Sequence, residues 1–404
     1  MKLSSLLTVG LALAAMPLVA LAQSLAIDSK NAPGSTKALF RISKPGSYHL
    51  TGNITGVAGK AGIEIASSNV SLDLRGFTLQ GNAQSLEGIR IPVSLNLENV
   101  TVSNGAITQW GKDGLGLINM EGDESCVVET TVISNIQSSR NLGAGIRVTG
   151  GSVVRDCTAV FNGGAGVVAG ENSTIERVTA AGNAWEGIWL ASGVARGCTS
   201  RENNANGFTL TGSGLIVDST ASGNKKAGFE SFFSGVISHC NAETNSGWGF
   251  LVGTSGRIEN SNARRNLLGG IRAVSGYATI LSNTIGFNLG QAATGILSYG
   301  GHNRIEGNHV TALGVGIHLA GNSGNSVILD NVTVGCDLGL KVDSSVNFIA
   351  RNIARNNQNK NFEIVSGNRA GSIVVPPASG AITNVGTGQS KGIGSTDPWA
   401  NISF

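Results

Sequence analysis

The sequence predicts an all-β solenoid, a single-stranded parallel β-helix of about 13 coils. First, a glycine followed by an aliphatic residue or phenylalanine recurs about every 21 residues, at Gly145, Gly166, Gly187, Gly207, Gly228, Gly249 and Gly270. Second, apolar residues flank one variable residue after each glycine, the period-two pattern of a strand. Third, 59 of the 404 residues are Gly and only 13% are charged, as in long β proteins with tight turns.

The repeat has fixed columns. An asparagine lies four residues before the glycine in successive repeats, at Asn162, Asn183, Asn203, Asn224, Asn245 and Asn266. Identical amides stacked at strand spacing, about 4.8 Å, predict a hydrogen-bonded ladder. Phe208, Phe229 and Phe250 follow the glycine in successive coils. We expect these rings to stack in the core, because coils that cannot bury an apolar face alone share one continuous core.

Residues 1–22 are predicted to be a signal peptide that is cleaved after Ala22. Lys2 is followed by an apolar run from Leu6 to Leu21, which ends in the small-x-small signal Ala20-Leu21-Ala22. The alternative is an anchoring helix, but about 16 residues is short for a bilayer span. We therefore expect a secreted, periplasmic or cell-surface protein whose mature chain has no transmembrane span.

Both ends of the rod are predicted to be capped, because open strand edges aggregate. We expect an N-terminal cap over residues 23–60, the β-helix over 61–355, and a C-terminal cap or tail over 356–404, where the repeat is lost. Trp399 and Phe404 are expected to dock at this C-terminal end.

The Gly-Ile-x-Val and Ile-x-Asn units, the asparagine column and the 21-residue period resemble the parallel β-helix repeat of the pectin-lyase-like superfamily. The resemblance covers about residues 60–355 and implies a right-handed helix. Residues 44–53, 70–77 and 397–401 resemble segments of exported bacterial β-helix proteins. That superfamily includes lyases, hydrolases, epimerases and non-enzymes. The Asn-Thr-Asp, Asp-Asp and Gly-His-Gly segments of polygalacturonases, the calcium-binding Asp cluster of pectate lyases and the Asp-Pro-His-Asp motif of alginate epimerases do not occur. No catalytic residue is carried over.

Cysteine and metal chemistry are expected to be structural at most. Cys157, Cys198 and Cys240 share one column and lie two coils apart, about 9.6 Å, which is beyond the Cα separation of about 7 Å that a disulfide allows. They are predicted to be buried free thiols, and Cys126 and Cys336 are too far apart to pair. No metal site or other cofactor is predicted from the histidines, and Ca²⁺ is left open.

An outward strip is predicted from the residue two positions after each glycine. It comprises Arg147, Val168, Trp189, Thr209, Glu230, Leu251, Arg272, Leu297, His318 and Lys341. An outward Trp189 on a flat sheet suits a sugar ring, and Trp185 and Trp248 lie in the adjoining turns. The predicted substrate-binding residues are therefore Trp189, Trp185, Arg147 and Trp248.

The candidate catalytic residues are Glu230, Arg272 and Lys226. Elimination at a uronic acid needs a cation for the sugar carboxylate and a base for the adjacent proton. Hydrolysis needs two carboxylates about 5 to 9.5 Å apart, and Glu186 or Glu243 could be the second. A structural interpretation stays open, in which the tryptophans cover Gly-rich turns and exposed charges only pair with one another.

The sequence thus predicts an exported carbohydrate-directed protein that binds a polysaccharide or cell-surface glycan, with lyase, epimerase or hydrolase activity left open. The alternative is a non-catalytic surface or extracellular-matrix scaffold or adhesion protein. A net charge of +3, evenly spread, argues against a nucleic-acid partner.

Overall fold

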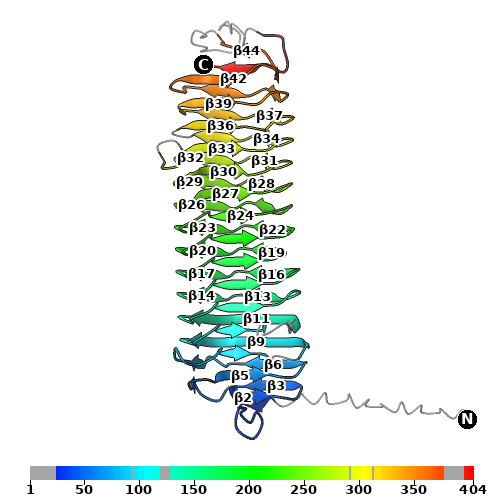
Figure 1. Cartoon of the computed structure of the whole chain (residues 1–404), viewed down its shortest axis with the longest axis vertical. Coiled ribbons are helices and arrows are strands. Elements are labelled where there is room, and N and C mark those ends of the chain that lie inside the picture. Colours follow the sequence, from blue (N-terminus) through cyan, green and yellow to red (C-terminus); the bar gives the residue numbers. More distant parts are fainter. Residues whose placement is uncertain (1–23, 93–94, 119–127, 291–292, 312–313, 377–394) are drawn as a thin grey trace, which may run out of the picture.

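The chain forms one long rod of stacked coils (Figure 1). The computed structural model describes residues 24–92, 95–118, 128–290, 293–311, 314–376 and 395–404. The predicted signal peptide and Cys126 lie outside these residues. The described residues form parallel strands in two sheets, of 15 and 30 strands, and contain no helix. This confirms the predicted all-β parallel β-helix, with 15 strands in the smaller sheet where about 13 coils were expected.

The 15-stranded sheet receives one strand from each coil and carries the predicted outward strip. Its strands are β2 (Ala38–Ile42), β5 (Ala61–Ile65), β8 (Ile89–Arg90), β10 (Leu115–Gly116), β12 (Ile146–Val148), β15 (Val167–Ala169), β18 (Ile188–Leu190), β21 (Phe208–Leu210), β24 (Phe229–Ser231), β27 (Trp248–Val252), β30 (Gly269–Ala273), β33 (Thr294–Ser298), β36 (Val315–Leu319), β39 (Leu338–Val342) and β42 (Lys360–Ile364).

The 30-stranded sheet receives two short strands from most coils. Its strands are β1 (Leu25–Ala26), β3 (Gly46–His49), β4 (Ile54–Thr55), β6 (Val70–Asp73), β7 (Thr78–Gln80), β9 (Leu97–Thr108), β11 (Val128–Ser139), β13 (Val153–Arg155), β14 (Thr158–Val160), β16 (Ser173–Glu176), β17 (Thr179–Ala181), β19 (Gly193–Arg196), β20 (Thr199–Arg201), β22 (Gly214–Val217), β23 (Thr220–Ser222), β25 (Val236–Ser238), β26 (Asn241–Glu243), β28 (Arg257–Glu259), β29 (Asn262–Arg264), β31 (Thr279–Leu281), β32 (Thr284–Gly286), β34 (Arg304–Glu306), β35 (His309–Thr311), β37 (Val327–Leu329), β38 (Val332–Val334), β40 (Phe348–Ala350), β41 (Ile353–Arg355), β43 (Arg369–Ala370), β44 (Ile373–Val374) and β45 (Asn401–Ser403).

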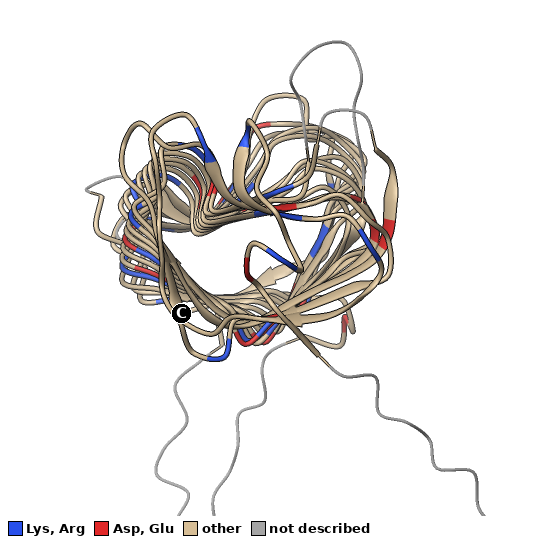
Figure 2. Ribbon diagram, turned by 90° about the horizontal axis from the view of Figure 1, so that it is seen from below, with Lys and Arg blue, Asp and Glu red and all other residues tan. Residues whose placement is uncertain are grey.

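The coils superpose when the rod is viewed along its axis (Figure 2). A residue in the left-handed region bends the chain between the paired strands of the larger sheet, as at Asp156 (φ 55°) and Arg177 (φ 51°). This single-residue bend recurs in coil after coil, so the side chains of each column stay in register. Equivalent side chains of successive coils then pack directly on one another.

The predicted core stack and asparagine ladder are both confirmed. The rings of Phe208 and Phe229 stack with centroids 4.8 Å apart, and those of Phe229 and Phe250 with centroids 5.1 Å apart. Each ladder amide donates from Nδ2 to Oδ1 of the next, at 2.9–3.4 Å, from Asn141 to Asn288. The ladder also accepts backbone N–H groups, which satisfies buried turns.

A second corner carries the cysteine column. Cys157, Cys198 and Cys240 are buried free thiols, as predicted. Further along the rod the same corner becomes a second amide ladder, which runs through Asn283, Asn308, Asn331, Asn352 and Asn401 with Nδ2 to Oδ1 distances of 2.9–3.1 Å. This ladder was not predicted from the sequence because the spacing of the later repeats is irregular.

Short strands cover both described ends of the rod. β1 pairs with β3 at one end, and β45 pairs with β41 and β44 at the other. Trp399 packs edge-on against Phe348, with centroids 5.7 Å apart, and the Phe404 N–H donates to the Ala354 carbonyl at 3.2 Å. Within the described residues, no helix is long and apolar enough to cross a membrane.

Candidate functional site

The outward strip exists in the register predicted from the repeat. Strand pairing places its residues directly opposite one another from Arg147 to Lys341, without a slip. In the middle, Trp189 pairs with Thr209 and Thr209 pairs with Glu230. Leu251 and then Arg272 follow. One face of the smaller sheet therefore carries an indole, a carboxyl and a guanidinium in line.

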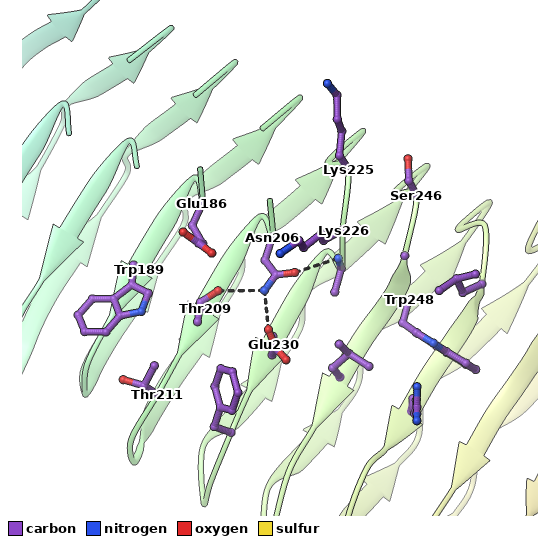
Figure 3. Close-up of a pocket in the computed structure, with 16 residues that line it drawn as sticks. Glu186, Trp189, Asn206, Thr209, Thr211, Lys225, Lys226, Glu230, Ser246 and Trp248 are labelled. Atoms are coloured by element: carbon purple, nitrogen blue, oxygen red, sulfur yellow. Dashed lines mark hydrogen bonds between the residues drawn. The ribbon is translucent and has the colours of Figure 1, made fainter. Parts of the chain in front are cut away.

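A groove of about 660 Å³ follows this line and is here called the Glu230 groove (Figure 3). Strands of the 15-stranded sheet form its floor, and its walls come from the turns that precede and follow these strands. The candidate residues that line it are Trp189, Lys226, Glu230, Trp248 and Arg272, together with Glu186, Asn206, Thr209 and Lys225. The structure thus brings together all three predicted catalytic residues and two of the predicted binding residues.

Glu230 is partly buried at the centre of this groove. Its Oε2 accepts a hydrogen bond of 2.5 Å from Nδ2 of Asn206. Burial raises the pKa of the Glu230 carboxyl above its ordinary value, and the nearby Glu186 carboxylate raises it further. The Asn206 hydrogen bond and the Lys226 ammonium oppose that rise without cancelling it. A carboxyl in such an environment holds its proton to higher pH and is suited to acid–base chemistry.

Asn206 is a residue of the candidate site that was not predicted from the sequence. It is buried, and its amide makes three contacts: with Glu230, with Oγ1 of Thr209 at 3.2 Å, and with the backbone N–H of Ala227 at 3.0 Å. Figure 3 shows the amide lying between Thr209 and Glu230. It occupies the column immediately before the repeat glycine, where Ala144, Ala165 and Ala227 are small. A polar residue in that column was the signal available from the sequence.

The groove contains cations that lack a carboxylate partner. Lys225, Lys226 and Arg272 form no ion pair within the described part of the chain, although Lys226 lies close enough to Glu230 to affect its pKa. The guanidinium of Arg272 lies 5.2 Å from the centroid of the Tyr299 ring. Its Nε is buried and has no hydrogen-bond partner among the described residues. Such an orphaned buried donor is uncommon in native proteins and costs free energy.

A second hollow, of about 700 Å³, adjoins the groove and is here called the Trp185 hollow. Trp185 and Arg147 line it, and it shares Trp189 and Glu186 with the Glu230 groove. Arg147 is already engaged, since its Nε lies 2.6 Å from Oδ2 of Asp113. The guanidinium that was predicted to bind a ligand therefore has its charge balanced within the protein.

The remaining candidates lie in different environments. Trp248 lines the groove but is only 8% exposed, whereas Trp185 is 64% exposed. Glu243 lies on β26 in the other sheet and pairs with Arg264 and Arg265 at 3.3 and 3.2 Å. Glu186 is therefore the second carboxylate of the groove, and Glu243 is not part of it.

Several charges on the 30-stranded sheet form ion pairs, either between adjacent coils or within one strand. Arg177 lies 2.7 Å from Asp156, as its place in the repeat predicts. Exposed pairs of this kind contribute about 0–1 kcal/mol each. Across the described ranges, no group of three or more His, Cys, Asp or Glu side chains is arranged to hold a metal ion. The three unpaired cations of the groove lie together in one recess, whereas Arg155 and Arg196, which also form no ion pair among the described residues, lie on separate strands of the 30-stranded sheet.

Comparisons with known proteins agree with the fold. The family model for a right-handed β-helix region matches residues 88–247, as the resemblance in the repeat predicted. No curated protein matches the sequence.

Three solved structures are similar to this chain. The A-module of the mannuronan C-5 epimerase AlgE4 of Azotobacter vinelandii is 15% identical, with 75% of this chain and 90% of that chain covered and a TM-score of 0.44. The periplasmic alginate epimerase AlgG is 12% identical, with coverage of 78% and 80% and a TM-score of 0.42. The pectate lyase Pel9A is 15% identical, with coverage of 60% and 78% and a TM-score of 0.35.

Proposed function

We propose that this protein is exported and binds an acidic, uronic-acid-containing polysaccharide in the Glu230 groove, where Glu230 transfers a proton to or from the bound sugar. The observation that carries the proposal is the unpaired Arg272, whose buried Nε lacks an acceptor, two coils from a carboxyl with a raised pKa. A uronate carboxylate would pair with the terminal nitrogens of this guanidinium, which has no carboxylate partner among the described residues.

An indole and three cations in the same groove would bind the polysaccharide. Trp189 offers a partly exposed ring at one end, and Lys225, Lys226 and Arg272 offer positive charge in the middle and at the other end. Trp189 and Glu230 are separated by two strand spacings, about 9.6 Å, so one ligand can contact both. Interactions between a guanidinium and a carboxylate are charge-assisted and stronger than neutral hydrogen bonds.

The chemistry at Glu230 follows from its pKa and neighbours. As a carboxylate it would take the proton next to the sugar carboxylate, while Arg272 neutralises that carboxylate. In elimination the electron pair then forms a double bond as the 4-linked glycosidic C–O bond breaks, and the departing oxygen takes a proton from water. In epimerisation the carbon instead takes back a proton on its opposite face, from water or the Lys226 ammonium. As a carboxylic acid it would protonate a glycosidic oxygen, with Glu186 as the second carboxylate of a hydrolase. Both routes use the same groove, so the product formed distinguishes them.

The test is a panel of acidic and neutral polysaccharides incubated with the purified mature protein. Unsaturated ends, new reducing ends and uronate configuration are read together, for the wild type, Glu230→Gln and Arg272→Gln. Arg196→Gln is the matched control, because Arg196 is an exposed arginine of β19 on the 30-stranded sheet. We expect product from an acidic glycan, abolished in Glu230→Gln, weakened in Arg272→Gln and unchanged in Arg196→Gln.

Other outcomes assign other functions. Retention of an acidic glycan without product would reject proton transfer by Glu230 and leave a binding rod, the surface or matrix scaffold alternative. Failure to retain any acidic glycan, or retention that is unaffected by Arg272→Gln, would refute the proposed binding site.

A further inference from the structure

We infer that the Trp185 hollow binds an uncharged, O-acylated sugar residue of the same glycan, so that the ligand lies in one fixed direction along the rod. The inference rests on the proposed function for the identity of the acidic part. The two recesses then recognise different chemistry: anionic sugar beside Arg272, and acylated neutral sugar beside Trp185.

The lining of the hollow is apolar and offers few hydrogen-bond partners. Leu142, Val168, Trp185 and Trp189 form its walls, together with alanines and glycines. Leu142 is 58% exposed and Trp185 is 64% exposed, so these side chains present apolar surface to solvent. A free sugar hydroxyl placed here would lose water without gaining a partner, which costs free energy. An acyl group that caps the hydroxyl removes this cost and buries its methyl group.

The charges around the hollow disfavour a carboxylate. Asp113 neutralises Arg147, the one cation in the lining, through contacts of 2.6 and 3.5 Å. Glu171 and Glu186 also line the hollow and form no ion pair with any described residue. A uronate would therefore meet net negative charge here, whereas in the Glu230 groove it meets three unpaired cations. The two recesses are complementary to different parts of a ligand.

The hollow is created by the sequence of the turns. The wall is formed by the two turn residues that lie three and two positions before the repeat glycine. In the coil of the hollow these residues are Gly163 and Gly164, whereas in the coil of Glu230 they are Lys225 and Lys226. The same columns thus build an open apolar recess in one coil and a cationic wall three coils further along. Because Trp189 borders both recesses, a single chain of sugars can continue from one to the other.

The test is a set of four ligands: galacturonan fragments and xylan fragments, each in O-acetylated and deacetylated form. Affinities are measured by calorimetry for the wild type, Trp185→Ala and Arg272→Gln. We expect acetylation to tighten the binding of xylan about fourfold for each acetyl methyl group removed from water, and to leave the binding of galacturonan almost unchanged, because an acetylated uronate keeps its carboxylate. In Trp185→Ala this ratio should fall to about one, while Arg272→Gln should weaken both galacturonan forms equally and leave xylan unchanged.

Phe161→Ala is the control, because Phe161 is 57% exposed and lies outside both recesses. It should keep the acetyl preference. Equal affinity of the wild type for acetylated and deacetylated xylan, or a preference that survives Trp185→Ala, would overturn the inference. If the preference holds on xylan while galacturonan binds no tighter than xylan, the proposed acidic-glycan function fails and the acyl site stands.

Discussion

Asn206 links the stability of the rod to the chemistry of Glu230, and Asn206→Ala tests that link. The substitution removes the acceptor of the Ala227 N–H and the donor to Glu230. A buried backbone donor left without a partner costs about 1–3 kcal/mol, and a hydrogen bond to a charged group is worth about 1.5–3 kcal/mol. Since the Glu230 carboxylate can turn toward water in the groove, we expect a total loss of about 2–4 kcal/mol at pH 7.

The loss should depend on pH in a defined direction. The Asn206 hydrogen bond lowers the pKa of Glu230, so its removal raises that pKa further. Once Glu230 is protonated in acid, the charge-assisted part disappears and only the cost of the orphaned Ala227 N–H remains. Calorimetric unfolding at pH 7 and pH 4 should therefore show a larger destabilisation at pH 7. Any reaction that uses the Glu230 carboxylate as a base should also need higher pH in this variant.

The control is Asn204→Ala, two residues away, because Asn204 is exposed. It should change stability by no more than about 0.5 kcal/mol. The reasoning would be refuted if Asn206→Ala behaved like Asn204→Ala, or if its cost were the same at both pH values.

Three further predictions concern the core and the groove. Glu230→Gln should gain stability relative to the wild type at pH 7 but not at pH 4 in urea unfolding, because a raised folded-state pKa stabilises the wild type only until the pH rises through that pKa. Asn224→Ala should cost about 3–5 kcal/mol in the same assay, since this buried amide bonds to both neighbouring asparagines and to the backbone; a loss below about 1 kcal/mol would mean that the ladder is not cooperative. Cys157, Cys198 and Cys240 should react with a thiol reagent only after unfolding, because burial raises their pKa values to about 11, 11 and 12; rapid labelling of the native protein would contradict this.

The outward strip could be predicted from the sequence because, in a solenoid with a constant repeat length, equivalent residues of successive coils lie directly opposite one another. Counting from each glycine placed Trp189, Glu230 and Arg272 on one face, and strand pairing bears this out. Where steps of 25 and 23 residues interrupt the repeat, the residues after the glycine keep their register, but the distance back from the glycine to the ladder position changes, and the ladder that begins at Asn283 was not predicted.

Contacts between columns could not be predicted in this way. The hydrogen bond between Asn206 and Glu230 depends on the side-chain rotamers of both residues, and the position of a residue in the repeat does not specify its rotamer. Trp248 and Trp185 were both predicted to lie in turns beside the outward strip, yet Trp248 is buried and Trp185 is exposed. Trp185 lies in a turn two residues before its repeat glycine, whereas Trp248 lies one residue before its glycine and begins β27, where Gly269 of the next coil leaves room for the indole: a Cβ there would lie 2.4 Å from the Trp248 ring.

The two asparagine ladders overlap within a single coil, which contains the last residue of one ladder and the first residue of the other. One ladder ends at Asn288, whose Nδ2 has no partner in the described structure, and the other starts at Asn283 on a different corner. This coil is therefore joined to the coil before it and to the coil after it by an amide hydrogen bond, in addition to the backbone hydrogen bonds of both sheets. In a single-molecule stretching experiment the rod should therefore not rupture preferentially at the coil that contains both residues.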